Sequence, residues 1–109
     1  MSSLTTVARP YAKAAFDYGL QNQNISHWQE MLVFASEVAS NQQMKDVLKG
    51  SLSSTLAAEL FISVCAEQLD NHGQNFIKVM AENNRLLVLP QVLDLFNSLK
   101  AEYEKEIDV

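Results

Sequence analysis

The chain has 109 residues, of which 48% are apolar, a length and composition that suit a single domain with its own core and exclude a disordered tail. Only three glycines and two prolines are present, too few for an all-β fold with many tight turns. The net charge of −5, without a cluster of Lys or Arg, excludes a general attraction to nucleic acids and to anionic membranes.

The first predicted helix runs from Thr5 or Thr6 to Leu20 within the segment "LTTVARPYAKAAFDYG". Alanine favours helix, but Pro10 lies where this helix should already be formed. One interpretation places Pro10 in the first turn, where a missing N–H matters least, with Leu4 to Val7 as an irregular lead-in. The other is that the helix bends at Pro10.

The second predicted helix covers residues 26–40, "SHWQEMLVFASEVAS", after a break at "QNQN". Ser26 and Gln29 form a candidate capping box at its start. The third is the short segment 42–49, with Gly50 as its C-terminal stop.

Three further helices are predicted, at about Thr55 to Leu69, at residues 74–83 and from near Pro90 onwards. The segment "DNHG" is expected to end the fourth helix, and Pro90 is favoured at a first helical position. The run "RLLVLP" is interpreted as a linker whose leucines fill the core, and a charged tail at about 100–109 is expected to fray. The prediction is therefore a single domain over residues 1–109, an all-α, compact bundle of six short helices.

The predicted core takes residues from the apolar stripe of each helix, which recurs at helical spacing. The expected members are Phe16, Trp28, Leu32, Leu60, Phe61, Val64, Phe96 and Leu99. Cys65 lies on the same side of its helix, so we expect a buried and inert thiol.

The sequence offers no pattern that points to catalysis. His27 and His72 lack partner ligands at metal-binding spacing, and both are interpreted as solvated residues at helix ends. A glycine-rich phosphate loop is missing, and no apolar run reaches the about 18 residues of a membrane span. We therefore expect a non-enzymatic protein without catalytic residues, bound metal or cofactor.

The first helix carries more apolar surface than a single core contact needs. Projected at about 100° per residue, its apolar side covers an arc of roughly 160°, against the about 100° of an ordinary surface helix. One edge of the arc is made of small residues that suit close packing, and the other contains larger ones, including two tyrosines. The small edge is Ala8, Ala12, Ala15 and Gly19, and the other is Val7, Tyr11, Ala14 and Tyr18.

The fifth helix has the same surplus, with an apolar arc of roughly 200°. Two interpretations remain open from periodicity alone. In the first, both helices are buried on two sides. In the second, a groove between them accepts an amphipathic helix from a partner.

The segments "VARPYAKAAFDYG" and "NFIKVMAENNRLLVLPQVL" resemble the delta subunit of bacterial F-type ATP synthase, whose mitochondrial relative is the oligomycin-sensitivity-conferring protein. The similarity covers essentially the whole chain but only the N-terminal part of such a subunit, so we expect a piece of a longer protein. The family commonly has Gly after Glu-Asn, where this chain has Asn84, which must then adopt a left-handed conformation.

The resemblance implies a six-helix domain that belongs to the stator, or peripheral stalk, and lies at the top of the catalytic head. Its first and fifth helices would bind the N-terminal helix of an alpha subunit. The missing C-terminal domain would meet the b subunits. The implied role is mechanical, because the stalk keeps the head from turning with the rotor during proton transport. The implied location is peripheral, on the cytoplasmic face of the bacterial inner membrane.

The residues expected to contact the alpha-subunit helix combine this implied helix pair with our choice of edge. They are Val7, Tyr11, Ala14 and Tyr18 of the first helix, and Phe76, Val79, Met80 and Asn83 of the fifth. Two alternatives remain, a stand-alone adaptor for another amphipathic helix and a self-associating structural bundle.

Overall fold

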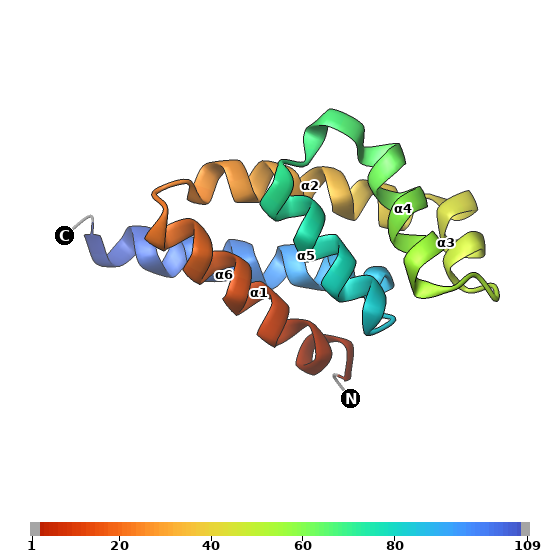
Figure 1. The fold of residues 1–109 in the computed structure, drawn as a ribbon. Helices are drawn as coiled ribbons and strands as arrows, with labels where there is room; N and C mark the ends of the chain where they lie inside the picture. Colours follow the sequence, from red (N-terminus) through yellow and green to blue (C-terminus); the bar gives the residue numbers. More distant parts are fainter. Residues whose placement is uncertain (1–2, 108–109) are drawn as a thin grey trace.

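The computed structural model describes residues 3–107, which form six α-helices and two short 3-10 helices, with no strand in that range (Figure 1). The predicted all-α bundle is therefore confirmed. The helices are α1 (Ser3–Gln21), α2 (Ile25–Ser40), α3 (Gln42–Leu48), α4 (Ser54–Cys65), η1 (Ala66–Gln68), α5 (Asn71–Glu82), η2 (Leu86–Val88) and α6 (Leu89–Ile107).

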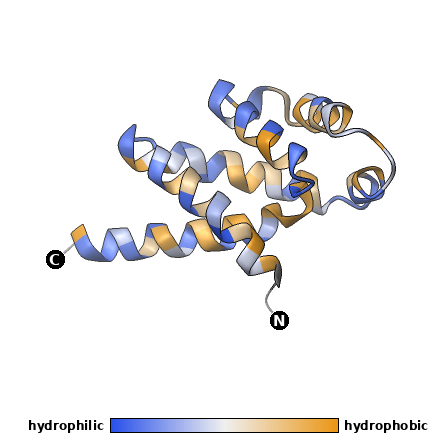
Figure 2. Cartoon of the chain, turned by 60° about the horizontal axis from the view of Figure 1, so that its bottom comes forward, coloured by the Kyte–Doolittle hydropathy of each residue, from blue (hydrophilic) through white to orange (hydrophobic). Residues whose placement is uncertain are grey.

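The long helices α1 and α2 pack on α6, while α5 packs on α4. In Figure 1, α3 and α4 lie at the end of the bundle opposite the C terminus, and α1 and α5 lie on the face toward the viewer. Hydrophobic and hydrophilic residues alternate along the helices (Figure 2), as the helical spacing in the sequence requires.

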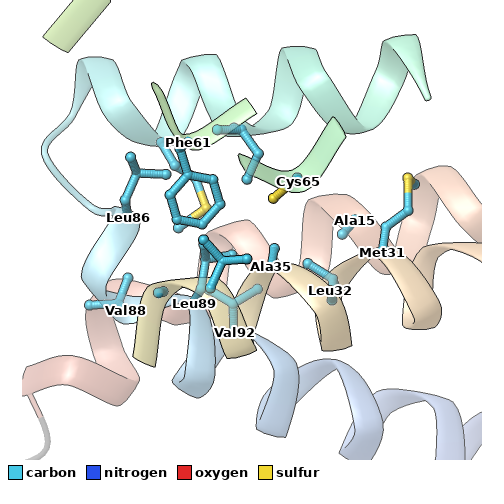
Figure 3. Close-up of a cluster of buried hydrophobic side chains, with 14 of the residues drawn as sticks. Ala15, Met31, Leu32, Ala35, Phe61, Cys65, Leu86, Val88, Leu89 and Val92 are labelled. Carbon is cyan, nitrogen blue, oxygen red and sulfur yellow. The ribbon is translucent and has the colours of Figure 1, made fainter. Parts of the chain in front are cut away.

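The centre of the core is the meeting point of α4, η2 and α6 with α2 (Figure 3). Phe61, Leu89 and Val92 are fully buried there, and Leu86 is 4% exposed. Two of the three leucines of "RLLVLP" do fill the core, Leu86 of η2 and Leu89 at the start of α6, whereas Leu87 is only half-buried and lies outside it. Asn84, in the preceding turn, has the expected left-handed conformation, with φ of 57°.

The core predictions for α4 are only partly right. Phe61 and Cys65 are buried with Ala57 and Ala58, but Leu60 is 37% and Val64 48% exposed. Helix α4 is apolar around most of its circumference, so periodicity could not show which side faces inward. Of the other predicted core residues, Phe16, Trp28, Leu32 and Phe96 are buried, and Leu99 is partly buried against the core.

Several predicted helix ends are also wrong. Leu4 to Val7 are helical, so Pro10 lies well inside α1 and not in its first turn. Helix α2 begins at Ile25 after Asn24, and the expected capping partner Gln29 instead donates a 2.8 Å hydrogen bond to Asn97 of α6.

The segment "DNHG" starts α5 and does not end α4. The chain leaves α4 at Ala66, whose φ is 50°, and Asp70 then caps α5. At the other end of the chain, residues 100–107 of the predicted charged tail are helical, and residues 108–109 lie outside the described range.

Cys65 is 1% exposed, which confirms the expected burial. Burial raises the pKa of the Cys65 thiol to about 11, because an apolar environment disfavours the thiolate. The thiol is consequently a packing group.

We predict that replacing Phe61 with Ala lowers the free energy of unfolding by about 3–5 kcal/mol, because a fully buried ring leaves a cavity. Urea unfolding followed by circular dichroism measures the change. Leu60→Ala, one residue away on the exposed side of α4, is the control and should cost about 1 kcal/mol or less. Equal losses for the two variants would mean that α4 is rotated from the orientation described.

We also predict slow modification of Cys65 by a disulfide reagent at pH 8. A rise in pKa from 9.0 to about 11 lowers the thiolate fraction about 100-fold relative to a free thiol, and burial blocks access. Full reaction should occur in denaturant. Rapid labelling of the folded chain would contradict the buried position.

Candidate helix-binding groove

A groove of about 520 Å³ runs between α1 and α5, with α2 beneath it. We call it the α1–α5 groove. Most of its lining is apolar or aromatic. The lining residues are Pro10, Tyr11, Ala14, Ala15 and Tyr18 of α1, Trp28 of α2, and His72, Asn75, Phe76 and Val79 of α5.

Aromatic rings in edge-to-face contact form the floor of the groove. The centroid of Trp28 lies 5.8 Å from that of Tyr18 and 5.5 Å from that of Phe76, and Tyr11 lies 6.4 Å from Phe76. Such pairs contribute about 0.5–1.5 kcal/mol each beyond the area they bury. Because the rings come from three helices, they fix the spacing of α1 and α5.

Helix α1 divides its apolar arc in the way the sequence predicted. Ala8, Ala12 and Ala15 are at most 2% exposed, whereas Tyr11 and Tyr18 are half-buried and Ala14 is exposed. Gly19 continues the small edge, since a Cβ at this position would lie 3.2 Å from the Cα of Ile25. The small edge therefore packs internally, and Tyr11, Ala14 and Tyr18 of the other edge line the groove.

Helix α5 is divided similarly. Ile77, Met80 and Ala81 are at most 3% exposed, whereas Phe76 is half-buried and Val79 is 48% exposed. Both helices thus use part of the surplus arc for the core and leave part of it in contact with solvent.

Five of the eight predicted contact residues line the groove, namely Tyr11, Ala14, Tyr18, Phe76 and Val79. The assignment of Met80 is wrong because its side chain is fully buried. At 3.6 residues per turn, Met80 is rotated about 40° from Phe76 toward buried Ile77, whereas Val79 is rotated about 60° the other way, toward solvent.

Val7 and Asn83 also fall outside the lining. Val7 is half-buried against the core. Asn83 ends α5, where its amide Nδ2 donates a 3.0 Å hydrogen bond to the carbonyl of Val79.

The sequence reasoning missed several lining residues, of which Trp28 and His72 are the most informative. The sequence predicts Trp28 as a core residue, and it is indeed 3% exposed, but it also forms the groove floor. His72 lay outside the predicted fifth helix. Once Asp70 is read as a cap, α5 starts at Asn71 and His72 falls one turn before Phe76, on the same side.

Polar contacts hold the end of the groove where α5 begins. The Tyr18 hydroxyl lies 3.0 Å from the imidazole nitrogens of His72, which links α1 to α5. His27 Nε2 of α2 lies 2.9 Å from Asp70 Oδ2, and the N–H of Gly73 donates a 2.7 Å hydrogen bond to Asp70 Oδ1. Both histidines are exposed at helix ends, as predicted, but each has a partner from another element.

The electrostatics of Asp70 follow from these contacts. Burial by itself raises the pKa of the Asp70 carboxyl, but the hydrogen bond from Gly73 and the contact with His27 outweigh it and lower the pKa below its ordinary 3.8. The carboxylate is therefore ionised at neutral pH and caps α5, whose N-terminal end carries positive partial charge.

The groove is suited to binding an apolar helix face. Its one titratable side chain apart from the tyrosines is His72. Within residues 3–107, His, Cys, Asp and Glu side chains do not gather in threes in a way that could hold a metal ion. The α1–α5 groove therefore offers a binding partner apolar contact area and aromatic side chains to pack against.

Comparison with known proteins gives one consistent result. A family model described as "ATP synthase delta (OSCP) subunit" matches residues 7–109. The chain is similar to the ATP synthase subunit delta of Vibrio alginolyticus, at 59% identity over 109 residues, and to that of Vibrio cholerae serotype O1 strain O395, at 58%. Each alignment covers 100% of this chain and 62% of the relative, so the chain spans less than two thirds of their length.

We predict that Asp70→Ala lowers the free energy of unfolding at pH 7 by about 0.5–2 kcal/mol, because α5 loses its N-terminal cap. Asp70→Asn, which keeps an acceptor for Gly73, should cost less. Urea unfolding of the three proteins provides the comparison.

The cost of Asp70→Ala should depend on pH. Because folding lowers the pKa of Asp70, the stabilisation from its ionised form is present above the ordinary value of 3.8 and is lost as pH falls through the lower folded value. The difference in the free energy of unfolding between the original chain and Asp70→Ala should therefore become smaller below about pH 3.8. A difference that widens on acidification would contradict this assignment.

Proposed function

The chain belongs to the ATP synthase delta (OSCP) subunit family, and on this basis we propose that it is a component of the peripheral stalk of an F-type ATP synthase. The observation that carries the proposal is the α1–α5 groove. In this proposal the groove binds the N-terminal helix of an alpha subunit and so anchors the catalytic head.

Three features of the groove support a helix as its occupant. It lies between two helices, in the geometry by which an amphipathic helix lays its apolar face into a hydrophobic groove. Tyr11 and Tyr18 are half-buried, and tyrosine is enriched among residues that dominate binding energy. The exposed, small Ala14 between them leaves room for an incoming helix backbone.

The role is mechanical in this proposal and requires no catalysis by the chain. A stalk that resists rotor torque needs contacts that dissociate slowly, and dissociation rates are set mainly by the quality of the interface. A groove fixed by interlocking aromatic rings costs little reorganisation on binding, which favours such a contact.

The proposal extends to the rest of the complex. The relatives are longer than this chain. We propose that the contact with the b subunits is made by a C-terminal domain outside this chain. The location would be peripheral, on the cytoplasmic face of the bacterial inner membrane. In the part of the chain that the structure describes, none of the helices has the length and apolarity needed to cross a membrane.

We predict that Ala14→Asp weakens binding of a peptide from the N terminus of the alpha subunit. A carboxylate at this exposed lining position blocks the helix and would be desolvated by it, so affinity should fall at least about tenfold. The free energy of unfolding should change by about 0.5 kcal/mol or less, because Ala14 is exposed. Calorimetric titration and urea unfolding measure the two quantities.

Ala101→Asp is the matched control, since it makes the same change at an exposed position of α6 away from the groove. It should bind the peptide normally. Tyr11→Ala should weaken binding by about 2 kcal/mol or more if Tyr11 is an anchor. Normal binding by Ala14→Asp, or its outright unfolding, would refute the assignment of this edge.

The same titration separates the two remaining alternatives. A stand-alone adaptor would bind other amphipathic helices as tightly as the alpha-subunit peptide. A self-associating bundle would ignore the peptide and form oligomers as its concentration rises.

A further inference from the structure

A second apolar surface lies away from the α1–α5 groove. Of the ten large apolar side chains exposed in the described part of the chain, six fall between residues 33 and 64. They are Val33, Val47, Leu52, Leu56, Leu60 and Val64. Val47, Leu60 and Val64 line one depression and Val33 lines an adjoining one, so these four gather on one side of the molecule, and exposed apolar patches of this kind mark interaction sites.

Three of these residues form a continuous ridge on α4. Leu56, Leu60 and Val64 follow one another at intervals of four, so they lie on one side of the helix and span about 12 Å along it. They are 52%, 37% and 48% exposed. The opposite side of α4 already supplies the core through Phe61 and Cys65, so folding does not account for the ridge.

Leu60 and Val64 of the ridge form one wall of a groove of about 470 Å³ between α2, α3 and α4, which we call the α2–α4 groove. Leu60 and Val64 face Phe34 and Val38 of α2 and Met44 and Val47 of α3. A smaller depression of about 240 Å³ continues it along α2, since both are lined by Phe34 and Glu37.

The charged side chains that line these two depressions are acidic. Glu37 lines both and Glu30 lines the second, while Lys45 and Lys49 of α3 line neither. A second copy of the chain, itself with a net charge of −5, would bring glutamates against glutamates. Charge complementarity therefore selects a basic partner, since opposite potentials across an interface favour association and like charges oppose it.

We propose that the α2–α4 groove binds a basic amphipathic helix of another protein. Its apolar side chains would pack against Leu60, Val64 and Phe34, and its Lys or Arg residues would pair with Glu30 and Glu37. The ridge of α4 accommodates about two turns of such a helix, which is the usual span of helix-in-groove anchors.

This binding site is independent of the proposed alpha-subunit contact. The residues that line the α2–α4 groove and its continuation are all different from those that line the α1–α5 groove. Failure of either proposal therefore leaves the other standing.

The test uses two designed helical peptides with leucines at identical positions, one with lysines and one with glutamates on the polar face. Each is titrated at low salt into the ¹⁵N-labelled chain. The lysine peptide should shift backbone amide resonances of α4 and of the α2 segment around Phe34 and Glu37. Its affinity should fall as salt is added, because exposed charge pairs are screened. The glutamate peptide should leave these resonances unchanged.

Variants identify the residues responsible. The double variant Glu30→Lys/Glu37→Lys should weaken binding of the lysine peptide about tenfold. Glu59→Lys is the matched control, because Glu59 lies on α4 but lines a separate depression beside α5, and it should have little effect. Leu60→Gln should also weaken binding about tenfold without loss of helical signal. If Leu60→Gln unfolds, the more exposed Val64→Gln replaces it.

Three results would overturn the proposal. The lysine peptide could leave the α4 resonances unchanged up to about 1 mM, a concentration that corresponds to negligible affinity. The glutamate peptide could bind the same residues equally well. Sedimentation could instead show a dimer that Leu60→Gln dissolves, which would assign the surface to a second copy of the chain.

Discussion

The close packing of α1 through its small residues is the constraint on which the candidate site depends. Ala8, Ala12 and Ala15 are at most 2% exposed, and this lets α1 lie against α6 and the core without bulky side chains between them. Once that edge is buried, the 3.6-residue repeat leaves Ala14 exposed and Tyr11 half-buried on the other edge. The groove is therefore a consequence of how α1 is seated in the bundle.

The second requirement is that α5 be held at a fixed distance from α1. Trp28 does this from below, since its ring contacts both Tyr18 and Phe76. Asp70 fixes the start of α5, because one carboxylate oxygen caps the helix and the other meets His27 of α2. These contacts preorganise the groove, which lowers the entropic cost of binding a partner.

The sequence was sufficient to predict the helical fold, the family, and the split of the apolar side of α1 into a buried edge of small residues and a second edge at the groove. Each of these rests on a strong and local signal. Sequence reasoning failed where a helix is apolar on both sides. On α4, Phe61 and Leu60 are equally hydrophobic, and only packing against α5 and α2 decides that Phe61 is buried. Met80 was misassigned for the same reason. The start of α5 was missed because Asp70 suits both a turn and a cap.

The central claim is that the apolar surplus of α1 and α5 is shared between the core and a partner helix. Intermolecular nuclear Overhauser effects between methyl groups of a bound alpha-subunit N-terminal peptide and the aromatic rings of the chain test it most directly. The account predicts contacts from the peptide to Tyr11, Tyr18 and Phe76. A peptide that binds but contacts only the ridge Leu56, Leu60 and Val64 of α4 would contradict it.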